Sequence, residues 1–88
     1  RQTKTPLPEE VDVGLWEALR ECRREQAEEQ GVPPYVIFHD STLIEMCTRL
    51  PQTRDEFANL TGVGERKLLK YGDAFLTAIR RAQDEAIT

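Results

Sequence analysis

The chain is 88 residues long, with 39% apolar residues, 32% charged residues and a formal net charge of −4. That length provides one small domain, and no apolar run approaches the ~20 residues needed to cross a bilayer, so we expect no membrane partner. The composition is typical of a compact soluble domain. Because the chain begins without Met and without an apolar signal segment, we expect a piece of a longer protein.

The charge is unevenly distributed along the chain. Residues 15–31 carry five Glu and three Arg, whereas residues 53–72 carry four Lys or Arg and three acidic residues. A strong nucleic-acid binder is usually basic, so the total charge argues against tight binding. The local field matters more than the sum, however. Only the second of these segments has a positive net charge, and the negative total should make any phosphate contact weak and salt-sensitive.

No set of residues predicts catalysis or a bound cofactor. Cys22 and Cys47 lack a metal-ligand spacing and fall within helical patterns, so we expect reduced, structural thiols of an intracellular protein. His39 is the only histidine, which leaves no pair of histidines for a metal site. The chain also lacks a nucleophile motif, a phosphate-loop lysine signature and paired carboxylates on a cleft-forming scaffold. We therefore predict a non-catalytic chain with no cofactor.

The first helix is expected after an N-terminal tail. Residues 1–12 contain two prolines and little that packs, which predicts a linker or extended tail before a domain at residues 13–88. From Leu15 the apolar residues recur at helical spacing. Gly31 is a typical C-cap, so we expect the first helix to end there.

A connector and a second helix are expected next. Pro33 and Pro34 forbid continuation of the first helix, and the β-like run at residues 35–38 has no partner strand in the sequence. We therefore expect an extended or single-turn connector there. Asp40 is a good N-cap for the following helix, which Pro51 ends. The predicted apolar stripe of that helix consists of Leu43, Ile44, Cys47 and Leu50.

Two turns organise the second half of the chain. Thr53 and Glu56 match a capping box, in which the threonine hydroxyl and the glutamate carboxylate each bond the other residue's backbone N–H. Residues 62–64, Gly-Val-Gly, turn the chain into a further helix, and Gly72 predicts a break or kink before the last one. The apolar residues expected to pack from these helices are Phe57, Leu60, Leu68, Leu69, Phe75, Leu76 and Ile79.

These patterns decide the fold class. Every apolar pattern is helical and the one β-like run is unpartnered, so we predict an all-α fold, a compact bundle of about five short helices with no sheet. Four aromatic residues at apolar-patterned positions are assigned to the core: Trp16, Phe38, Phe57 and Phe75.

The turn at residues 62–64 is one candidate phosphate site. Gly62 and Gly64 allow the backbone to come close to a ligand, and the free N–H groups that open the following helix attract an anion. The cations of the first turns share about one face of that helix. They are Arg66, Lys67 and Lys70. The alternative is a tight turn needing positive φ and an ordinary solvated face, and Glu65 would compete with a phosphate.

The other candidate is an aromatic ring. Tyr35 follows two prolines, which restrict the backbone and would hold the ring out to stack on an unpaired base. The alternative is a core or rim aromatic whose hydroxyl reaches water. The position of Tyr35 in the sequence is compatible with both.

Three separated motifs add a more specific signal. They are Leu15-Trp16-x-x-Leu19-Arg20, then Val32-Pro33-Pro34-Tyr35-Val36-Ile37-Phe38-x-Asp40-x-Thr42-Leu43-Ile44-x-Met46, and finally Gly62-Val63-Gly64-x-x-Lys67-Leu68-x-x-Tyr71-Gly72-x-x-Phe75-Leu76-x-x-Ile79. With these motifs, about residues 13–86 resemble the HRDC domain, the C-terminal helical module of RecQ-type DNA helicases that also occurs in ribonuclease D proteins. The middle motif most resembles the bacterial helicase versions.

The resemblance implies a five-helix bundle that residues 1–12 join, as a flexible linker, to a helicase core. Members of this family are accessory binders of single-stranded or structured DNA and have no ATPase of their own. In similar bacterial domains the aromatic residue of the Pro-Pro-Tyr elbow and nearby basic residues form the DNA-binding patch. Carried over, this names Tyr35 first, then Lys67, Lys70 and Arg66, with Arg20, Arg23 and Arg24 as flanking contacts.

The resulting interpretation is an accessory module of a RecQ-type, ATP-dependent DNA helicase of repair and recombination, in the bacterial cytoplasm at the nucleoid. Its partners would be single-stranded or branched DNA, weakly bound, and the helicase core of the same chain. One alternative is a protein-interaction module that docks on the parent helicase or on a partner protein. The other is the C-terminal domain of a ribonuclease D exonuclease, with RNA as the ligand.

Overall fold

The computed structural model describes residues 11–87, with the side chains of residues 11–85. Within this range it contains five helices and no strand, which confirms the predicted all-α bundle. The helices are α1 (Val13–Gln30), α2 (Pro34–Ile37), α3 (Asp40–Arg49), α4 (Arg54–Ala58) and α5 (Glu65–Ile87). Most of the predicted N-terminal tail lies outside the described residues. Of its last two residues, Val11 is buried and Asp12 caps α1.

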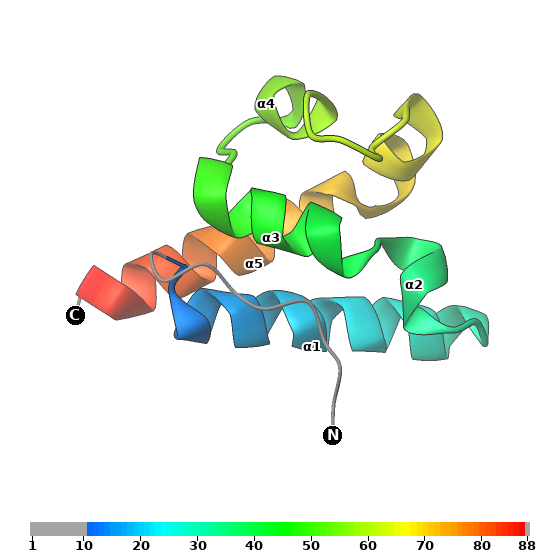
Figure 1. The fold of residues 1–88 in the computed structure, drawn as a ribbon, viewed down its shortest axis with the longest axis horizontal. Helices are drawn as coiled ribbons and strands as arrows, with labels where there is room; N and C mark the ends of the chain where they lie inside the picture. The colour runs from blue at the N-terminus through cyan, green and yellow to red at the C-terminus, as the bar shows by residue number, and fades with distance from the viewer. Residues whose placement is uncertain (1–10, 88) are drawn as a thin grey trace.

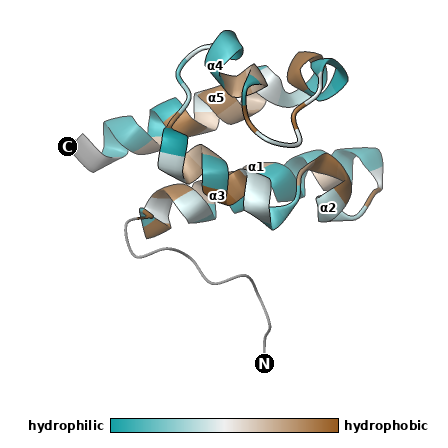
Figure 2. Ribbon diagram, turned by 45° about the horizontal axis from the view of Figure 1, so that its top comes forward, coloured by the Kyte–Doolittle hydropathy of each residue, from teal (hydrophilic) through white to brown (hydrophobic). Residues whose placement is uncertain are grey.

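The two long helices, α1 and α5, pack along each other, and the shorter helices complete the bundle. Helix α1 contacts α2, α3 and α5, whereas α4 packs on α5. In Figure 1, α1 lies along the lower side of the molecule and α4 at the top, with α3 and α5 between them. The C-terminal turns of α5 are hydrophilic, whereas its middle turns near α4 are hydrophobic (Figure 2).

Both ends of α1 are capped by local hydrogen bonds. The Asp12 carboxylate accepts from the backbone N–H groups of Gly14, at 2.8 Å, and Leu15, at 3.4 Å. At the other end, Gly31 takes a left-handed conformation with φ of 68°. The N–H of Val32 then reaches back to the carbonyl of Ala27 at 3.0 Å. The predicted C-cap at Gly31 is therefore confirmed.

The segment between α1 and α3 forms a single helical turn. Pro34 is the first residue of α2, where a proline loses no helical hydrogen bond. The predicted N-cap of α3 is wrong, because His39 holds the cap position and Asp40 is already helical. The Asp40 carboxylate instead forms an ion pair with Arg23 at 2.8 Å. At the other end, Leu50 is not part of the apolar stripe, because it is an exposed, left-handed C-cap.

The predicted capping box of α4 is half formed. The Thr53 hydroxyl accepts from the backbone N–H of Glu56 at 3.1 Å, as expected. The Glu56 carboxylate accepts instead from the N–H of Gln52, at 2.8 Å. Two side chains therefore still accept hydrogen bonds from backbone N–H groups at the start of this short helix. The Glu56 carboxylate, however, bonds the N–H of Gln52 and not that of Thr53.

Helix α5 is continuous, so the break predicted at Gly72 is wrong. A Cβ atom at Gly72 would lie 3.0 Å from Cδ1 of Leu68, one turn earlier. The glycine therefore makes room for the Leu68 side chain within one uninterrupted helix. Leu69 was predicted to pack, but its side chain is 68% exposed.

The core is built around aromatic rings from three parts of the chain. Phe38 packs edge-to-face against Phe75, with ring centroids 5.1 Å apart, and against Phe57 at 6.0 Å. These three residues and Trp16 are buried, as predicted. Phe38 belongs to the link between α2 and α3, so the core fixes that link directly onto α5.

The two cysteines are free thiols in the structure. Burial raises the pKa of Cys22 and that of Cys47 to about 11. Both thiols are therefore protonated at neutral pH and poorly nucleophilic. Within the described residues, no group of three or more Cys, His, Asp or Glu side chains is arranged to hold a metal ion. No helix in that range is long and apolar enough to span a membrane.

Candidate nucleic-acid interface

Tyr35 projects from an elbow whose neighbouring side chains are anchored in the core. Pro33 and Pro34 fix the start of α2, and Ile37 and Phe38 are fully buried. The Tyr35 side chain is 61% exposed. The structure therefore gives Tyr35 the outward position that stacking on a base would require; this rules out a core position, whereas a rim aromatic whose hydroxyl reaches water has the same exposure.

Arg23 locks this elbow onto α1. Its guanidinium donates to the carbonyl oxygen of Phe38 at 2.9 Å and forms the ion pair with Asp40. Arg23 is only 9% exposed. Its charge is used inside the protein, so Arg23 is a structural residue of the interface and we do not carry it forward as a DNA contact.

Lys67 lies against the same elbow from the side of α5. Its ammonium group is 5.5 Å from the centre of the Phe38 ring, within the range of a cation–π interaction. Because Phe38 is buried, the stem of Lys67 is half-buried as well. This contact brings the cation of α5 next to the segment that carries Tyr35.

Lys70 is held by the C-terminal end of α1. Its ammonium group donates to the side-chain oxygen of Gln30 at 3.1 Å, and the hydroxyl of Tyr71 donates to the same oxygen at 2.9 Å. No local pattern in the sequence reveals the role of Gln30, because its partners lie about forty residues further along the chain. Gln30 is the residue that ties the last turn of α1 to the cationic turns of α5.

The cations at the start of α5 have no acidic partner among residues 11–85. None of the three forms an ion pair there, whereas Arg20, Arg24, Arg49 and Arg54 each pair with a carboxylate. Arg66 is also exposed. Arg66, Lys67 and Lys70 are therefore not held in ion pairs within this range, although Glu65 precedes them in the sequence.

The glycine turn before α5 is pinned to α3. Gly62 has a positive φ of 85°, whereas Gly64 does not. The hydroxyl of Thr42 donates to the carbonyl of Thr61 at 3.1 Å, and the Glu45 carboxylate accepts from the N–H of Thr61 at 3.1 Å. These bonds hold the loop in a fixed conformation, so the first turn of α5 and its exposed N–H groups keep a fixed direction.

Arg20 and Arg24 of α1 line a hollow that Pro34 also lines. Arg20 stacks over the Trp16 ring and pairs with Glu17 at 3.9 Å. Arg24 is bound more firmly: its hydrogen bond to Glu21 is the main reason its pKa is raised, and Glu28 lies 2.7 Å away. Both residues are therefore close to the elbow but already neutralised in part.

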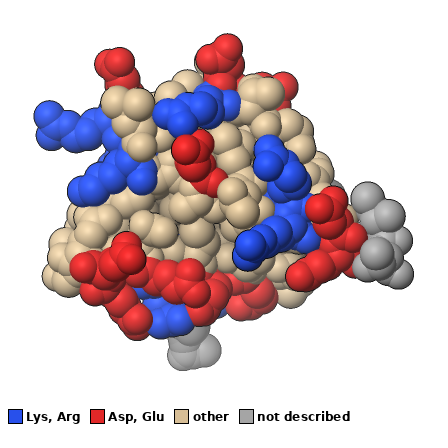
Figure 3. All heavy atoms as spheres, turned by 180° about the vertical axis from the view of Figure 1, so that it is seen from behind, with Lys and Arg blue, Asp and Glu red and all other residues tan. Residues whose placement is uncertain are grey.

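The surface charges are unevenly distributed. Figure 3 shows acidic side chains crowded along the lower edge, where α1 lies, and basic side chains at the upper left, where α5 begins; acidic side chains also stand along the upper edge, and a second basic group lies at the right. A nucleic acid would be repelled by the first region and attracted by the second. The molecule therefore has a basic region at the start of α5 although its total charge is negative.

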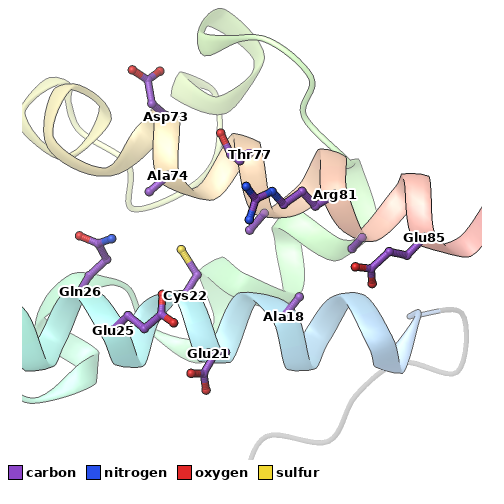
Figure 4. Close-up of a pocket in the computed structure, with 12 residues that line it drawn as sticks. Ala18, Glu21, Cys22, Glu25, Gln26, Asp73, Ala74, Thr77, Arg81 and Glu85 are labelled. Atoms are coloured by element: carbon purple, nitrogen blue, oxygen red, sulfur yellow. The ribbon is translucent and has the colours of Figure 1, made fainter.

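A groove of about 540 Å³ runs between α1 and α5 (Figure 4). Small side chains lie in it, including Ala18 and Ala74, and the thiol of Cys22 points across it toward α5. Its charged lining residues are Glu21, Glu25, Asp73, Glu85 and Arg81. Four carboxylates against one guanidinium make this groove unsuitable for a phosphate backbone.

The sequence model of the family described as "HRDC domain" matches residues 12–79, which is most of the chain. The chain belongs to the HRDC domain family. A solved structure, "D. radiodurans RecQ HRDC domain 3", superposes with a TM-score of 0.79 at 40% identity. That match covers 82% of this chain and 95% of the other, so over the matched part the fold is that of an HRDC domain.

Two curated relatives illustrate where similar HRDC domains occur. The "ATP-dependent DNA helicase RecQ" of Bacillus subtilis is 52% identical over 66 residues, which cover 75% of this chain and 11% of the helicase. The "ATP-dependent DNA helicase UvrD2" of Mycobacterium tuberculosis is 39% identical over 71 residues, covering 81% and 10%. This chain therefore spans about a tenth of the length of the helicases it matches.

Proposed function

We propose that this HRDC domain helps a parent DNA helicase hold single-stranded or branched DNA, through contacts that do not depend on base sequence. One observation carries the proposal. Lys67 packs on Phe38 of the elbow that exposes Tyr35, and the three cations at the start of α5 form no ion pair within residues 11–85, while acidic side chains line the α1 edge. Phosphates bind cations, and unpaired bases stack on exposed aromatic rings.

Each residue of this end has a proposed role. Lys67, Lys70 and Arg66 neutralise phosphates, and Tyr35 stacks on a base. Gly62 and Gly64 let the strand approach the first turn of α5. Arg20 and Arg24 are weaker flanking contacts, because glutamates already compete for their charge.

The parent protein is proposed to be a RecQ-type, ATP-dependent helicase acting in DNA repair and recombination in the bacterial cytoplasm, at the nucleoid. The relatives named above are helicases, which favours a helicase over a ribonuclease D parent. The domain itself is proposed to be non-catalytic and to carry no cofactor. The helicase core would supply ATP hydrolysis, and the HRDC domain would provide a second binding site for the strand.

A second candidate function, docking on the helicase core or on another protein, is favoured by the groove between α1 and α5. Its small apolar side chains leave room for a partner side chain, and its acidic lining suits a basic segment. The groove and the basic end occupy different surfaces, so the two functions are compatible.

Removing one cation at a time tests the DNA contacts. Lys67→Met keeps the stem that packs on Phe38 and removes the charge. We expect the slope of log affinity against log salt to fall in magnitude by about 0.7 on a single strand, the contribution of one phosphate contact. Tyr35→Ala is expected to weaken binding about fivefold or more with an unchanged slope. Fluorescence anisotropy with a labelled oligonucleotide measures both quantities.

Arg80→Met is the matched control for Lys67→Met. Arg80 is an exposed cation on the same helix, thirteen residues or about 20 Å beyond Lys67 at 1.5 Å per residue. Its loss changes the total charge equally but should leave the salt slope unchanged. An equal decrease in both variants would show that only the total charge matters and would contradict a local contact at Lys67.

A further inference from the structure

Tyr35 has a second ring beside it. The rings of Tyr35 and His39 are stacked, with centroids 6.1 Å apart and planes inclined by 25°. Both side chains are exposed, whereas Ile37 and Phe38 between them are buried. The chain therefore turns two aromatic side chains outward, one stacked beside the other, and two apolar side chains inward within five residues.

The backbone under both rings is fixed. The carbonyl of His39 accepts from the N–H groups of Thr42, at 3.0 Å, and Leu43, at 3.2 Å, at the start of α3. The carbonyl of Phe38 accepts from the buried Arg23. Two prolines fix the other side of the elbow. A ligand that binds both rings would consequently lose little free energy in ordering this segment.

The rings open onto a hollow of about 390 Å³ that Arg23, Asp40 and Ser41 also line. The two charged groups in this lining form an ion pair at 2.8 Å and so compensate each other. The hollow is therefore an electrically balanced space beside two planar faces. This chemistry suits a flat, neutral ring better than a phosphate, whose charge would be repelled by the carboxylate.

We propose that His39 is a second base-contacting residue, and that Tyr35 and His39 together seat one unpaired nucleobase of single-stranded DNA. The inference rests on the proposed DNA-binding function and adds a residue and a ligand class to it. The base lies against the two rings, and the phosphates on either side of it extend toward the cations of α5. Stacking of this kind tolerates any base, because every base has a planar face.

The test compares His39→Ala and His39→Phe in two oligonucleotides, one ordinary and one in which every base is replaced by an abasic site. His39 makes no side-chain capping bond to α3 and is exposed, so neither substitution removes a structural contact of the cap. We expect His39→Ala to bind the ordinary strand about fivefold more weakly, the lower end of what stacking on one base contributes. We expect His39→Phe to bind it as the wild type does. The abasic strand should bind all three proteins equally.

The outcomes separate this inference from the function on which it rests. If the wild type binds the ordinary strand and His39→Ala binds it equally well, His39 is not part of the platform, although DNA binding stands. If His39→Ala weakens binding to the abasic strand as much as to the ordinary one, His39 contacts the phosphates and the base-seating proposal is wrong. If the wild type binds neither strand at low salt, the proposed function itself fails and this inference fails with it.

Discussion

Replacing Phe75 with alanine is expected to lower the free energy of unfolding by about 3–5 kcal/mol. Phe75 is fully buried and touches both of the other core phenylalanines, at centroid distances of 5.1 Å to Phe38 and 6.5 Å to Phe57. A small domain has a total stability of only about 5–15 kcal/mol. The variant should therefore be partly unfolded at moderate temperature, and urea denaturation followed by circular dichroism measures the loss.

Leu69→Ala is the control on the same helix. Leu69 is as apolar as a core residue, but its side chain is 68% exposed. We expect a change within about 0.5 kcal/mol, as for other surface substitutions. A loss at Leu69 comparable with the loss at Phe75 would show that α5 buries a different face from the one described.

Gly62→Ala is expected to destabilise the domain by about 1–3 kcal/mol, which is the usual cost of holding a non-glycine residue in an unfavourable backbone region. Gly62 has φ of 85°, and an added Cβ would lie 3.0 Å from the hydroxyl oxygen of Thr42. That hydroxyl also donates to the loop carbonyl of Thr61, so it is not free to move away. The melting temperature should fall by about 4–8 °C per kcal/mol for a domain of this size.

Gly64→Ala provides the comparison for Gly62→Ala. Gly64 lies two residues away in the same turn, has no positive φ, and an added Cβ there would meet nothing within 4 Å. We expect little change in melting temperature. If both variants melt at the same temperature as the wild type, the conformation described for Gly62 does not constrain the turn.

The helix ends that are set by residues adjacent in the sequence were predictable. The C-cap at Gly31 follows from one glycine and two prolines, and the N-cap at Thr53 from its own hydroxyl. The error at Gly72 had a different cause. The low helical propensity of glycine predicts a break, but here the missing side chain accommodates Leu68 in a helix that packs on α1 and α4. Tertiary packing therefore outweighed the local preference.

The candidate interface was predictable only in part. The two prolines were compatible with an outward Tyr35 but did not decide its position, and the spacing of Lys67 and Lys70 indicated a cationic start of α5. The burial of Arg23 was not predictable, because its partners Phe38 and Asp40 belong to another element, and no local pattern reveals that contact. As a lone histidine, His39 gives no metal site, and it was assigned no other role from the sequence. Its position four residues after Tyr35 is the one feature of the sequence that could have indicated a contact between the two rings.

The central claim is that DNA binds the end of the molecule formed by the elbow and the start of α5. A titration of the ¹⁵N-labelled domain with single-stranded DNA, followed by ¹H–¹⁵N correlation spectra at low salt, tests it most directly. We predict the largest shifts in the amide signals of residues 35–39 and 62–71, with little change for residues 74–82, which line the α1–α5 groove from the side of α5. An unchanged spectrum, or shifts confined to that groove, would contradict the claim.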